Sequence, residues 1–539
     1  MKQTKRIIMK KNTAAKILNN LFEGFLNKKA VIGLLVLVLL TGVSTLKAQV
    51  SGTIFRDFNG NGTQQSVAPT IEPGIGGITV NAYNSNDVLL ATATTAVNGT
   101  YTLLVGTNAV RVEYVLPTNC TVSPLFDFPG LQGATFGSNV QFKTGGAGVT
   151  ANFALNNPAD YVNTTNPNFL INTYRNGNPM IEGTASVQPA MYQAAYSNAG
   201  TTPLPTQTAL SSQIGSTWGI AYSKQYKKAF TSAYLKRHVG MGPGGPTGAP
   251  SAVNAPGSIY FINPSSTTGG SFFFSLDALG PAYYTHNHTA GAALNVRDNV
   301  TRGISGNIAT ANADATTYDQ VGKVGIGDLE ISDDGRYLFL VNFYDRKLYR
   351  IDLQNAISPV TPTAAQITTY AIPNPNAAGS LNAGEFRPFA LKYSRGKIYV
   401  GSVTSGQTAA SVSATVNTAM NAYVYSFDVA TGTFNTTPVL TFSLSHNRGT
   451  DADGINETWK PWTNQFNPQT IGTTGSSSLR GGIPQPMFAD IEIDATNGII
   501  LGFRDRFGDQ SGYQNLNPAG TYYFSGFAYG DVYRGQINC

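Results

Sequence analysis

Apolar and polar residues alternate over short stretches along most of this chain, which is the two-residue period of half-buried β-strands. In GITVNAYN, at residues 77–84, the apolar positions are Ile78, Val80 and Ala82, and alternation returns at 101–105 and 110–117. Between these stretches Asn98-Gly99 predicts a hairpin turn. We therefore expect residues 49–155 to form one β-sandwich of the immunoglobulin-like or prealbumin-like kind, with residues 156–165 as a linker.

Beyond the linker the pattern becomes a loose repeat of strand, glycine turn and aromatic-rich second strand. The clearest copy is GDLEISDDGRYLFLVNFYDRKLYRIDL at 327–353, and related stretches lie at 218–235, 389–403 and 488–506. Such units cannot bury both faces alone, and packing them radially gives a β-propeller. The expected fold class is therefore all-β, with a propeller over residues 166–539. Seven blades are favoured and six are the alternative.

The first 48 residues differ from the rest. Eight Lys or Arg side chains precede the apolar run VIGLLVLVLLTGV at 31–43, and Ala48 follows. This order is typical of a secretory signal peptide cleaved after Ala48. The chain is thus expected to be secreted or held at the cell surface, with an uncleaved anchor as the minor alternative.

Removing this segment changes the charge balance. The whole chain carries +6 at pH 7, but residues 1–48 hold nine of its Lys and Arg and one acid. The remainder has 26 cations and 28 anions, so the sequence does not favour nucleic-acid binding, which depends on clustered cations. No other stretch is apolar enough to span a membrane. Cys120 and Cys539 are too few for a disulfide scaffold, and the sequence leaves their pairing open.

Three motifs in the first domain occur in a known order: GTIFRDFNGNGTQQ (52–65), EPGIGGITVNAYN (72–84) and TTAVNGTYTL (94–103). In these motifs the domain resembles the SdrD B-like (Cna B-type) module of bacterial surface proteins. The resemblance covers about a fifth of the chain and implies a β-sandwich. KRHVGMGPGG (236–245), WKPW (459–462) and GFRDRFGDQ (502–510) resemble an exported propeller that accompanies such modules in Bacteroidetes-type surface proteins.

The first motif places oxygen-bearing side chains at alternate positions before a glycine. In the SdrD B-like family this loop resembles an EF-hand calcium loop. The matching positions here are Asp57, Asn59, Asn61, Thr63 through its backbone carbonyl, and Glu72. Gln64-Gln65 stand where the family often has an aspartate. Two carboxylates predict weak calcium binding. The alternative is a polar turn closed by its own backbone bonds.

Two further groups have the residue types of metal ligands. His286-Asn287-His288 puts two imidazoles on one side of an extended segment, but zinc needs three or four ligands. We expect polar loop histidines, as for His238 and His446. DADGINETW offers the second group, which lacks the EF-hand register and reads better as a solvated turn. Its members are Asp451, Asp453, Asn456 and Glu457.

Arginine–carboxylate pairs are the remaining charged signal. Arg504, Arg506, Asp505 and Asp509 lie close in sequence, and Arg387 precedes a proline. Such pairs fasten neighbouring elements through bidentate hydrogen bonds. We expect a structural role for them at the propeller channel, with an acidic ligand as the alternative.

Catalytic motifs are lacking: the sequence has no G-x-S-x-G, H-E-x-x-H or P-loop pattern. Asp328 and Glu330 recur in blade position as Asp490 and Glu492, which indicates a role in the repeat. We therefore expect a non-catalytic protein, with no enzyme activity, that serves adhesion or envelope scaffolding. The sandwich would be a stiff spacer.

In this interpretation propeller loops, including Trp459 and Trp462, would contact a glycan or protein partner. For these two tryptophans a place in the buried core is the alternative. A hydrolase or lyase acting on polysaccharide is the alternative. Carboxylates clustered at one end of the channel would favour it, and an apolar plug would count against it. A third alternative is an N-terminal fragment of a longer adhesin, with a propeller incomplete at the C-terminus.

Overall fold

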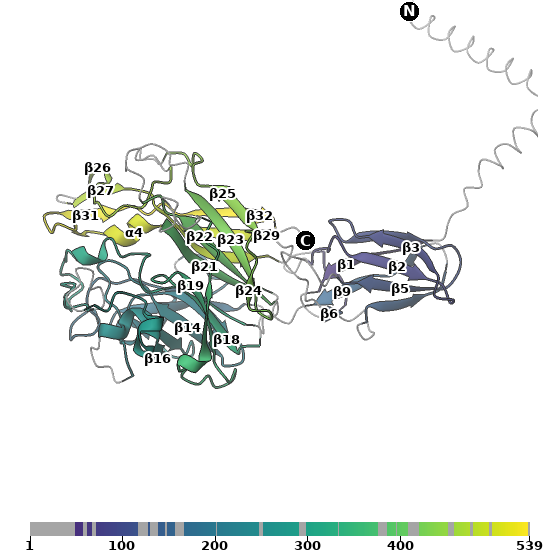
Figure 1. Ribbon diagram of the computed structural model, residues 1–539, viewed down its shortest axis with the longest axis horizontal. Helices are drawn as coiled ribbons and strands as arrows, with labels where there is room; N and C mark the ends of the chain where they lie inside the picture. Colours follow the sequence, from purple (N-terminus) through teal and green to yellow (C-terminus); the bar gives the residue numbers. More distant parts are fainter. Residues whose placement is uncertain are drawn as a thin grey trace, which may run out of the picture. The chain divides into compact units, whose positions relative to one another are not determined.

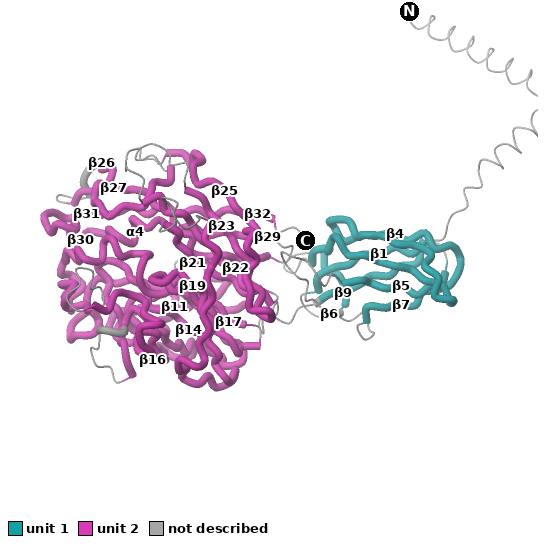
Figure 2. The backbone as a smooth tube through the Cα atoms, in the orientation of Figure 1, with its two compact units in different colours: residues 1–116, 129–156 teal, residues 117–128, 157–539 magenta. Residues whose placement is uncertain are grey.

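The computed structural model describes residues 49–57, 62–66, 72–116, 128–129, 138–145, 148–156, 166–200, 202–246, 252–289, 298–332, 334–375, 385–394, 396–407, 420–450, 458–474, 478–494 and 498–536. The expected signal segment, the linker after residue 156 and both cysteines lie outside these ranges. The chain divides into two compact units (Figure 2), unit 1 with residues 1–116 and 129–156 and unit 2 with 117–128 and 157–539. No helix in the described ranges is both long and apolar enough to cross a membrane.

Unit 1 is a sandwich of two sheets. The first contains β4 (Thr100–Leu104), β1 (Gln49–Arg56), β9 (Phe153–Asn156) and β6 (Phe128–Pro129), with β8 (Val149–Thr150) also paired to β1. The second contains β3 (Leu89–Thr94), β2 (Thr79–Tyr83), β5 (Val110–Val115) and β7 (Val140–Lys143). Alternate side chains face inward, and Tyr114 stacks on Phe153 with ring centroids 4.0 Å apart. The alternating apolar pattern therefore becomes the buried layer of the sandwich.

The turn predicted at Asn98-Gly99 forms, but it does not close a simple hairpin. Gly99 has a φ of 79°, and its N–H donates to the Ala96 carbonyl at 2.7 Å. The strands on either side, β3 and β4, belong to different sheets. The turn therefore carries the chain from one layer of the sandwich to the other.

Unit 2 is a β-propeller, so the predicted fold class is confirmed (Figure 1). Four of its sheets begin with strands that pack side by side in sequence order, namely β13 (Thr217–Ser223), β17 (Ile326–Ile331), β21 (Phe386–Ser394) and β28 (Pro486–Ile493). The outer strands of these four sheets are β14 (Lys228–Ala233), β15 (Ser258–Ile262), β16 (Gly270–Ser275), β18 (Tyr337–Asn342), β19 (Lys347–Asp352), β20 (Ile367–Ala371), β22 (Lys397–Thr404), β23 (Asn421–Asp428), β24 (Thr433–Phe434), β25 (Leu440–Ser443), β29 (Gly498–Asp505) and β32 (Asp531–Gln536).

Two more sheets complete the described part of unit 2. One consists of β10 (Asn168–Asn172), β11 (Pro189–Ala195) and β12 (Thr206–Leu210), and the other of β26 (Gln469–Thr474), β27 (Ser478–Gly482), β31 (Tyr523–Gly526) and β30 (Asn515–Leu516). The described residues of unit 2 thus give six sheets, of which four pack as successive blades, and the blade number, seven or six, stays a prediction. Helices are short, as expected: α3 (Ser211–Ile214), α4 (Arg506–Ser511) and the 3-10 turns η2 (Ala252–Gly257), η3 (Leu276–Leu279), η4 (Pro281–Tyr283), η5 (Ala315–Thr317) and η6 (Ala364–Gln366).

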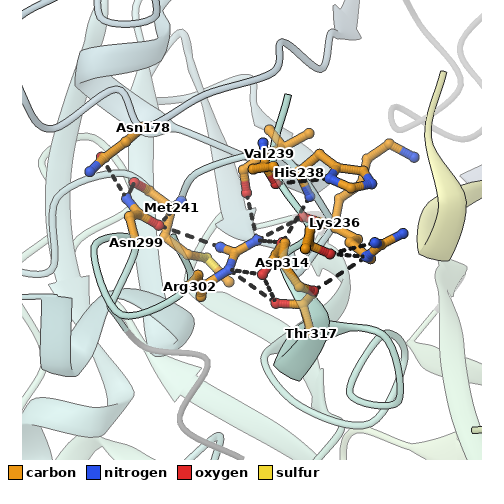
Figure 3. Close-up of polar contacts among 12 residues, drawn as sticks. Asn178, Lys236, His238, Val239, Met241, Asn299, Arg302, Asp314 and Thr317 are labelled. Carbon is orange, nitrogen blue, oxygen red and sulfur yellow. Dashed lines mark hydrogen bonds and ion pairs between the residues drawn. The ribbon is translucent and has the colours of Figure 1, made fainter. Parts of the chain in front are cut away.

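Long connections between blades are held by a buried ion pair (Figure 3). The Arg302 guanidinium donates to both carboxylate oxygens of Asp314, at 3.0 and 2.7 Å. It also donates to Thr317 Oγ1 at 3.0 Å and to the carbonyls of Lys236 and Val239, both at 3.1 Å. Arg302 and Asp314 have fully buried side chains. The pair therefore joins residues 236–241 to residues 298–317 where both leave the sheets.

Candidate active site

The candidate site is built on the first strands of three neighbouring blades, β17, β21 and β28. Residues two apart on a strand face the same side, so Asp328 lies beside Glu330, and Asp490 beside Glu492. Each of these three strands has a register shift against its second strand, which falls next to Asp328 in β17 and next to Asp490 in β28. Such bulges re-aim side chains. The repeated D-x-E pattern therefore presents four carboxylates from two blades.

Lys392 on β21 lies between the two glutamates. Its Nζ donates to Glu492 Oε1 at 3.0 Å and lies 3.4 Å from Glu330 Oε1. Burial alone would lower the pKa of Lys392, but Glu330 and Glu492 outweigh it and raise that pKa above its ordinary value. Lys392 therefore remains a cation that ties the three strands together.

Asp328 is the most enclosed of the four acids. Its carboxylate accepts the backbone N–H groups of Leu329 at 2.9 Å and Leu391 at 3.1 Å. Burial, followed by the like charge of Asp490, raises its pKa well above the ordinary value. Burial also raises the pKa of Glu330 to about 7, against the opposing effect of Lys392. Both carboxyls are thus disposed to hold protons near neutral pH.

Asp490 and Glu492 are exposed to solvent. Burial, with the like charge of Glu492 added, nevertheless raises the pKa of Asp490. Asp490 and Glu492 are therefore the carboxyls of the cluster that a solute can reach, whereas Asp328 is buried and Glu330 is half-buried.

The beginnings of the same strands are closed by aromatic rings. Trp218, Tyr234, Phe343 and Phe389 come from three blades and contact one another with ring centroids 4.7 to 6.5 Å apart. An apolar plug was expected to count against a hydrolase. The aromatic rings count against a hydrolase site at the end of the channel where these strands begin. The carboxylates and Lys392 lie further along the strands, so the charged side chains are towards the other end.

The arginine–carboxylate pairs have the structural role predicted for them. Arg504 Nη2 lies 2.6 Å from Asp509 Oδ1, and Tyr234 donates to Asp509 Oδ2 at 2.7 Å. Lys236 also pairs with Asp509. Burial alone would raise the pKa of Asp509, but Arg504 and Lys236 hold it well below its usual range. Arg504 stacks on Trp218 at 4.1 Å, so it fastens α4 to the aromatic plug.

Arg506, Asp505 and Arg387 also serve the packing. Arg506 is fully buried and donates to the carbonyls of Val321 at 2.8 Å and Asp319 at 2.9 Å. Asp505 caps α4 by accepting the Phe507 N–H at 2.9 Å. Arg387 lies over the Trp462 ring at 5.6 Å.

The predicted calcium loop lies in unit 1 between β1 and β2, and it is described in part. Asn59 and Asn61 lie outside the described residues. Asp57 is 1 % exposed and accepts the Gly62 N–H at 2.7 Å, while Glu72 is 2 % exposed and accepts the Gln65 N–H at 2.9 Å. Thr63 lies between these two turns. The loop thus has two buried carboxylates that fold its backbone, and its calcium binding stays a prediction.

Other sequence candidates meet different outcomes. Asp451, Asp453, Asn456 and Glu457 lie outside the described residues. Trp459 and Trp462 are 0 % and 2 % exposed. Their expected role as contact residues is therefore wrong, because both rings pack inside the propeller.

The histidines are also more buried than expected. His238 is 3 % exposed and makes hydrogen bonds to Asn312 and Ser511. His286 is fully buried, whereas His446 is exposed, as a loop histidine should be.

Two residues of these sites carried no signal of their own. Lys392 occupies the blade position at which the neighbouring strands have Glu330 and Glu492. A lysine aligned with two glutamates in the repeat could have indicated an ion pair between the strands. Asp277 stands beside His286 and His288, and nothing in SLDAL marks it as a partner.

No family model matches the chain. Colossin-A of Dictyostelium discoideum is 24% identical over 352 residues, which are 64% of this chain and 3% of that protein. The chain thus spans a small fraction of the curated relative it matches.

Similar solved structures include two enzymes by their descriptions. An endo-arabinase from Bacteroides thetaiotaomicron has 12% identity and a TM-score of 0.25, and the match covers 56% of this chain and 72% of the endo-arabinase chain. A putative 6-phosphogluconolactonase from Bacteroides uniformis has 12% identity and a TM-score of 0.27, and the match covers 69% of this chain and 100% of that one. Likeness at this level carries no argument about substrate.

The expectation that the chain is no enzyme is contradicted, because the blades bring four carboxylates together around Lys392, the arrangement stated above as favouring a hydrolase. The expected role of Asp328, Glu330, Asp490 and Glu492 in the repeat stays a prediction, and the structure adds that Lys392 lies between Glu330 and Glu492.

Proposed function

We propose that this chain is an exported hydrolase that cleaves a neutral polysaccharide at the polar end of the propeller channel. The observation that carries the proposal is the cluster of Asp490 and Glu492, both exposed, with Asp328, Glu330 and Lys392. Four carboxyls against one ammonium disfavour an anionic substrate. Export is supported by the signal-like pattern of residues 1–48.

Asp490 and Glu492 lie two residues apart on one stretch of strand, where they pair regularly with Gly502 and Ile500, so their Cα atoms are about 6.7 Å apart. Inverting enzymes place their two carboxyl groups about 6.5–9.5 Å apart, which leaves room for a water molecule. We propose single displacement for this site, and the stereochemistry of the product tests it.

The environments of the two carboxyls then assign their roles. Asp490, with a raised pKa, is the general acid that protonates the departing glycosidic oxygen. Glu492, held by Lys392, is the general base that takes a proton from the attacking water. Lys392 is a positioning residue that orients Glu492, and the like charge of Glu492 adds to burial in keeping Asp490 protonated.

The proposal is tested on the full chain with a panel of neutral polysaccharides, by the release of reducing ends. Asp490→Asn and Glu492→Gln should each lower kcat/KM about 100- to 10,000-fold, the usual contribution of general acid–base catalysis. Asp352→Asn is the matched control, because Asp352 pairs with Arg336 on an outer strand at 2.9 Å. Thermal melting would confirm that each variant is folded.

The stereochemistry of the product gives a second test. Proton NMR of the first product should show the anomer of inverted configuration. A retained configuration would remove the assignment of Glu492 as base. Hydrolysis that is unchanged in both variants would remove the site altogether.

For unit 1 we propose an SdrD B-like spacer with weak calcium affinity. Support comes from the three motifs and from the buried carboxylates of Asp57 and Glu72, each holding one turn of the same loop.

A further inference from the structure

A second polar cluster lies on the same propeller, on the connection between β16 and β17. Asp277 belongs to η3, and His286 and His288 follow η4. One side-chain atom of each residue lies within 4.8 Å of the others. The group is separate from the carboxylate cluster: Thr285 accepts the N–H of Gly325 directly before β17 begins, whereas Glu330 lies near the end of that strand.

The side chains of this group are buried without the hydrogen bonds that burial demands. His286 is 0 % exposed, and neither its Nδ1 nor its Nε2 has a hydrogen-bond partner among the described residues; His288 Nε2 has none either. Buried polar atoms are nearly always satisfied, so three orphans at one point call for a missing partner. The partner must bind nitrogen lone pairs or receive N–H donors.

Distances in the cluster fit a metal ion better than direct contact. His286 Nδ1 lies 3.3 Å from Asp277 Oδ2, and His288 Nε2 lies 3.4 Å from Asp277 Oδ1, without hydrogen-bond geometry. Ligands at about 2.1 Å from a tetrahedral zinc ion are separated from each other by about 3.4 Å. Each imidazole nitrogen is therefore about as far from an Asp277 oxygen as two ligands of one zinc ion are from each other.

The three ligands are also oriented in advance. The Thr285 backbone N–H and hydroxyl donate to the two oxygens of Asp277, at 2.6 and 2.8 Å. Tyr284 stacks on His288 with ring centroids 3.5 Å apart and an interplanar angle of 5°. These contacts resemble the outer-shell support that fixes carboxylate and imidazole ligands in metal sites.

We propose that Asp277, His286 and His288 bind a divalent transition-metal ion of the zinc type. Two imidazoles and one carboxylate leave the fourth position for water, on the side where His288 is 13% exposed. The backbone carbonyls of Tyr284 and Thr285 accept hydrogen bonds from Asn342 at 3.1 Å and from Gly325 at 2.8 Å, both next to the following blade. An ion held by the flanking residues would therefore stabilise the connection to that blade.

The test uses the full chain, stripped with a chelator and titrated with Co²⁺ and Zn²⁺ alone. One Co²⁺ per chain should bind and give the visible absorption of a tetrahedral ion, and Zn²⁺ should displace it. His288→Gln, at the partly exposed position, should weaken Co²⁺ binding at least tenfold, and Asp277→Asn should do the same. His446→Gln, at an exposed histidine, is the matched control and should bind as the wild type does.

Two outcomes would overturn the proposal. The first is the lack of any Co²⁺ absorption in the folded wild-type chain. The second is equal binding by wild type, His288→Gln and Asp277→Asn, which would place the ion elsewhere. If His286→Gln does not fold, His288→Gln and Asp277→Asn still decide the question.

Discussion

At the scale of the residue, environment decides what a titratable side chain does in this protein. Asp490 and Asp509 are both aspartates on or beside the last blade, yet their pKa values move in opposite directions. Burial and Glu492 raise the pKa of Asp490, whereas Arg504 and Lys236 outweigh burial at Asp509 and lower it. The first is suited to proton transfer, and the second serves as a permanent anion that fastens elements.

His238 allows a pH prediction at this scale. Burial, followed by the charge of Arg237, lowers its pKa to about 3, so it stays neutral in the folded protein. The unfolded chain takes up a proton near pH 6.5, and stability is therefore lost as pH falls from about 6.5 towards 3. This residue should contribute about 1.4 kcal/mol of unfolding free energy per pH unit in that window. In His238→Asn, urea unfolding between pH 4 and 6 should show a slope smaller by that amount; equal slopes would contradict the shift.

At the scale of the element, the blades are specified locally while their connections are held by long-range polar bonds. The blades that begin with β13 and β17 are meanders of strands adjacent in sequence, whereas the blade that begins with β28 takes β32 as its third strand. The connection carrying Arg302 has no regular structure beyond η5, and its shape depends on the ion pair with Asp314.

Breaking this ion pair should be costly. Arg302→Met leaves the Asp314 carboxylate buried and unpaired, and should lower the free energy of unfolding by about 3–5 kcal/mol. Adding Asp314→Asn removes that charge, so the double variant should be more stable than Arg302→Met alone. Urea denaturation of the three proteins measures both effects. A double variant less stable than either single one would show that the hydrogen bonds to carbonyls, and not the charge, dominate.

At the scale of the whole molecule, the chain consists of two units, each with its own buried core. Separate cores predict separate cooperative transitions. Calorimetry of the full chain should therefore show two, and millimolar calcium should raise the one belonging to unit 1. Asp57→Ala should abolish this rise and leave the second transition unchanged. A calcium effect that survives the substitution would assign the ion to another site.

Much of the fold followed from local pattern. The alternation in 77–84 and 110–117 became β2 and β5, and the repeat at 327–353 became β17, β18 and β19. These stretches could be predicted because strand period and turn chemistry act over a few residues. The connection made by Asn98-Gly99 could not be predicted. The same two residues can join strands of one sheet or strands of two sheets.

The sequence by itself thus determined the all-β class, the division into sandwich and propeller, and the strands of each blade. Only the tertiary structure decided which charged groups meet. Glu330, Lys392 and Glu492 lie on three blades, and their contact depends on how the blades pack around the axis. Likewise Asp277 reaches His286 and His288 only because η3 and η4 turn the chain back, and Trp459 is buried only because a neighbouring blade covers it. Local pattern sets the period of each strand, but contacts between distant residues depend on packing that no short stretch encodes.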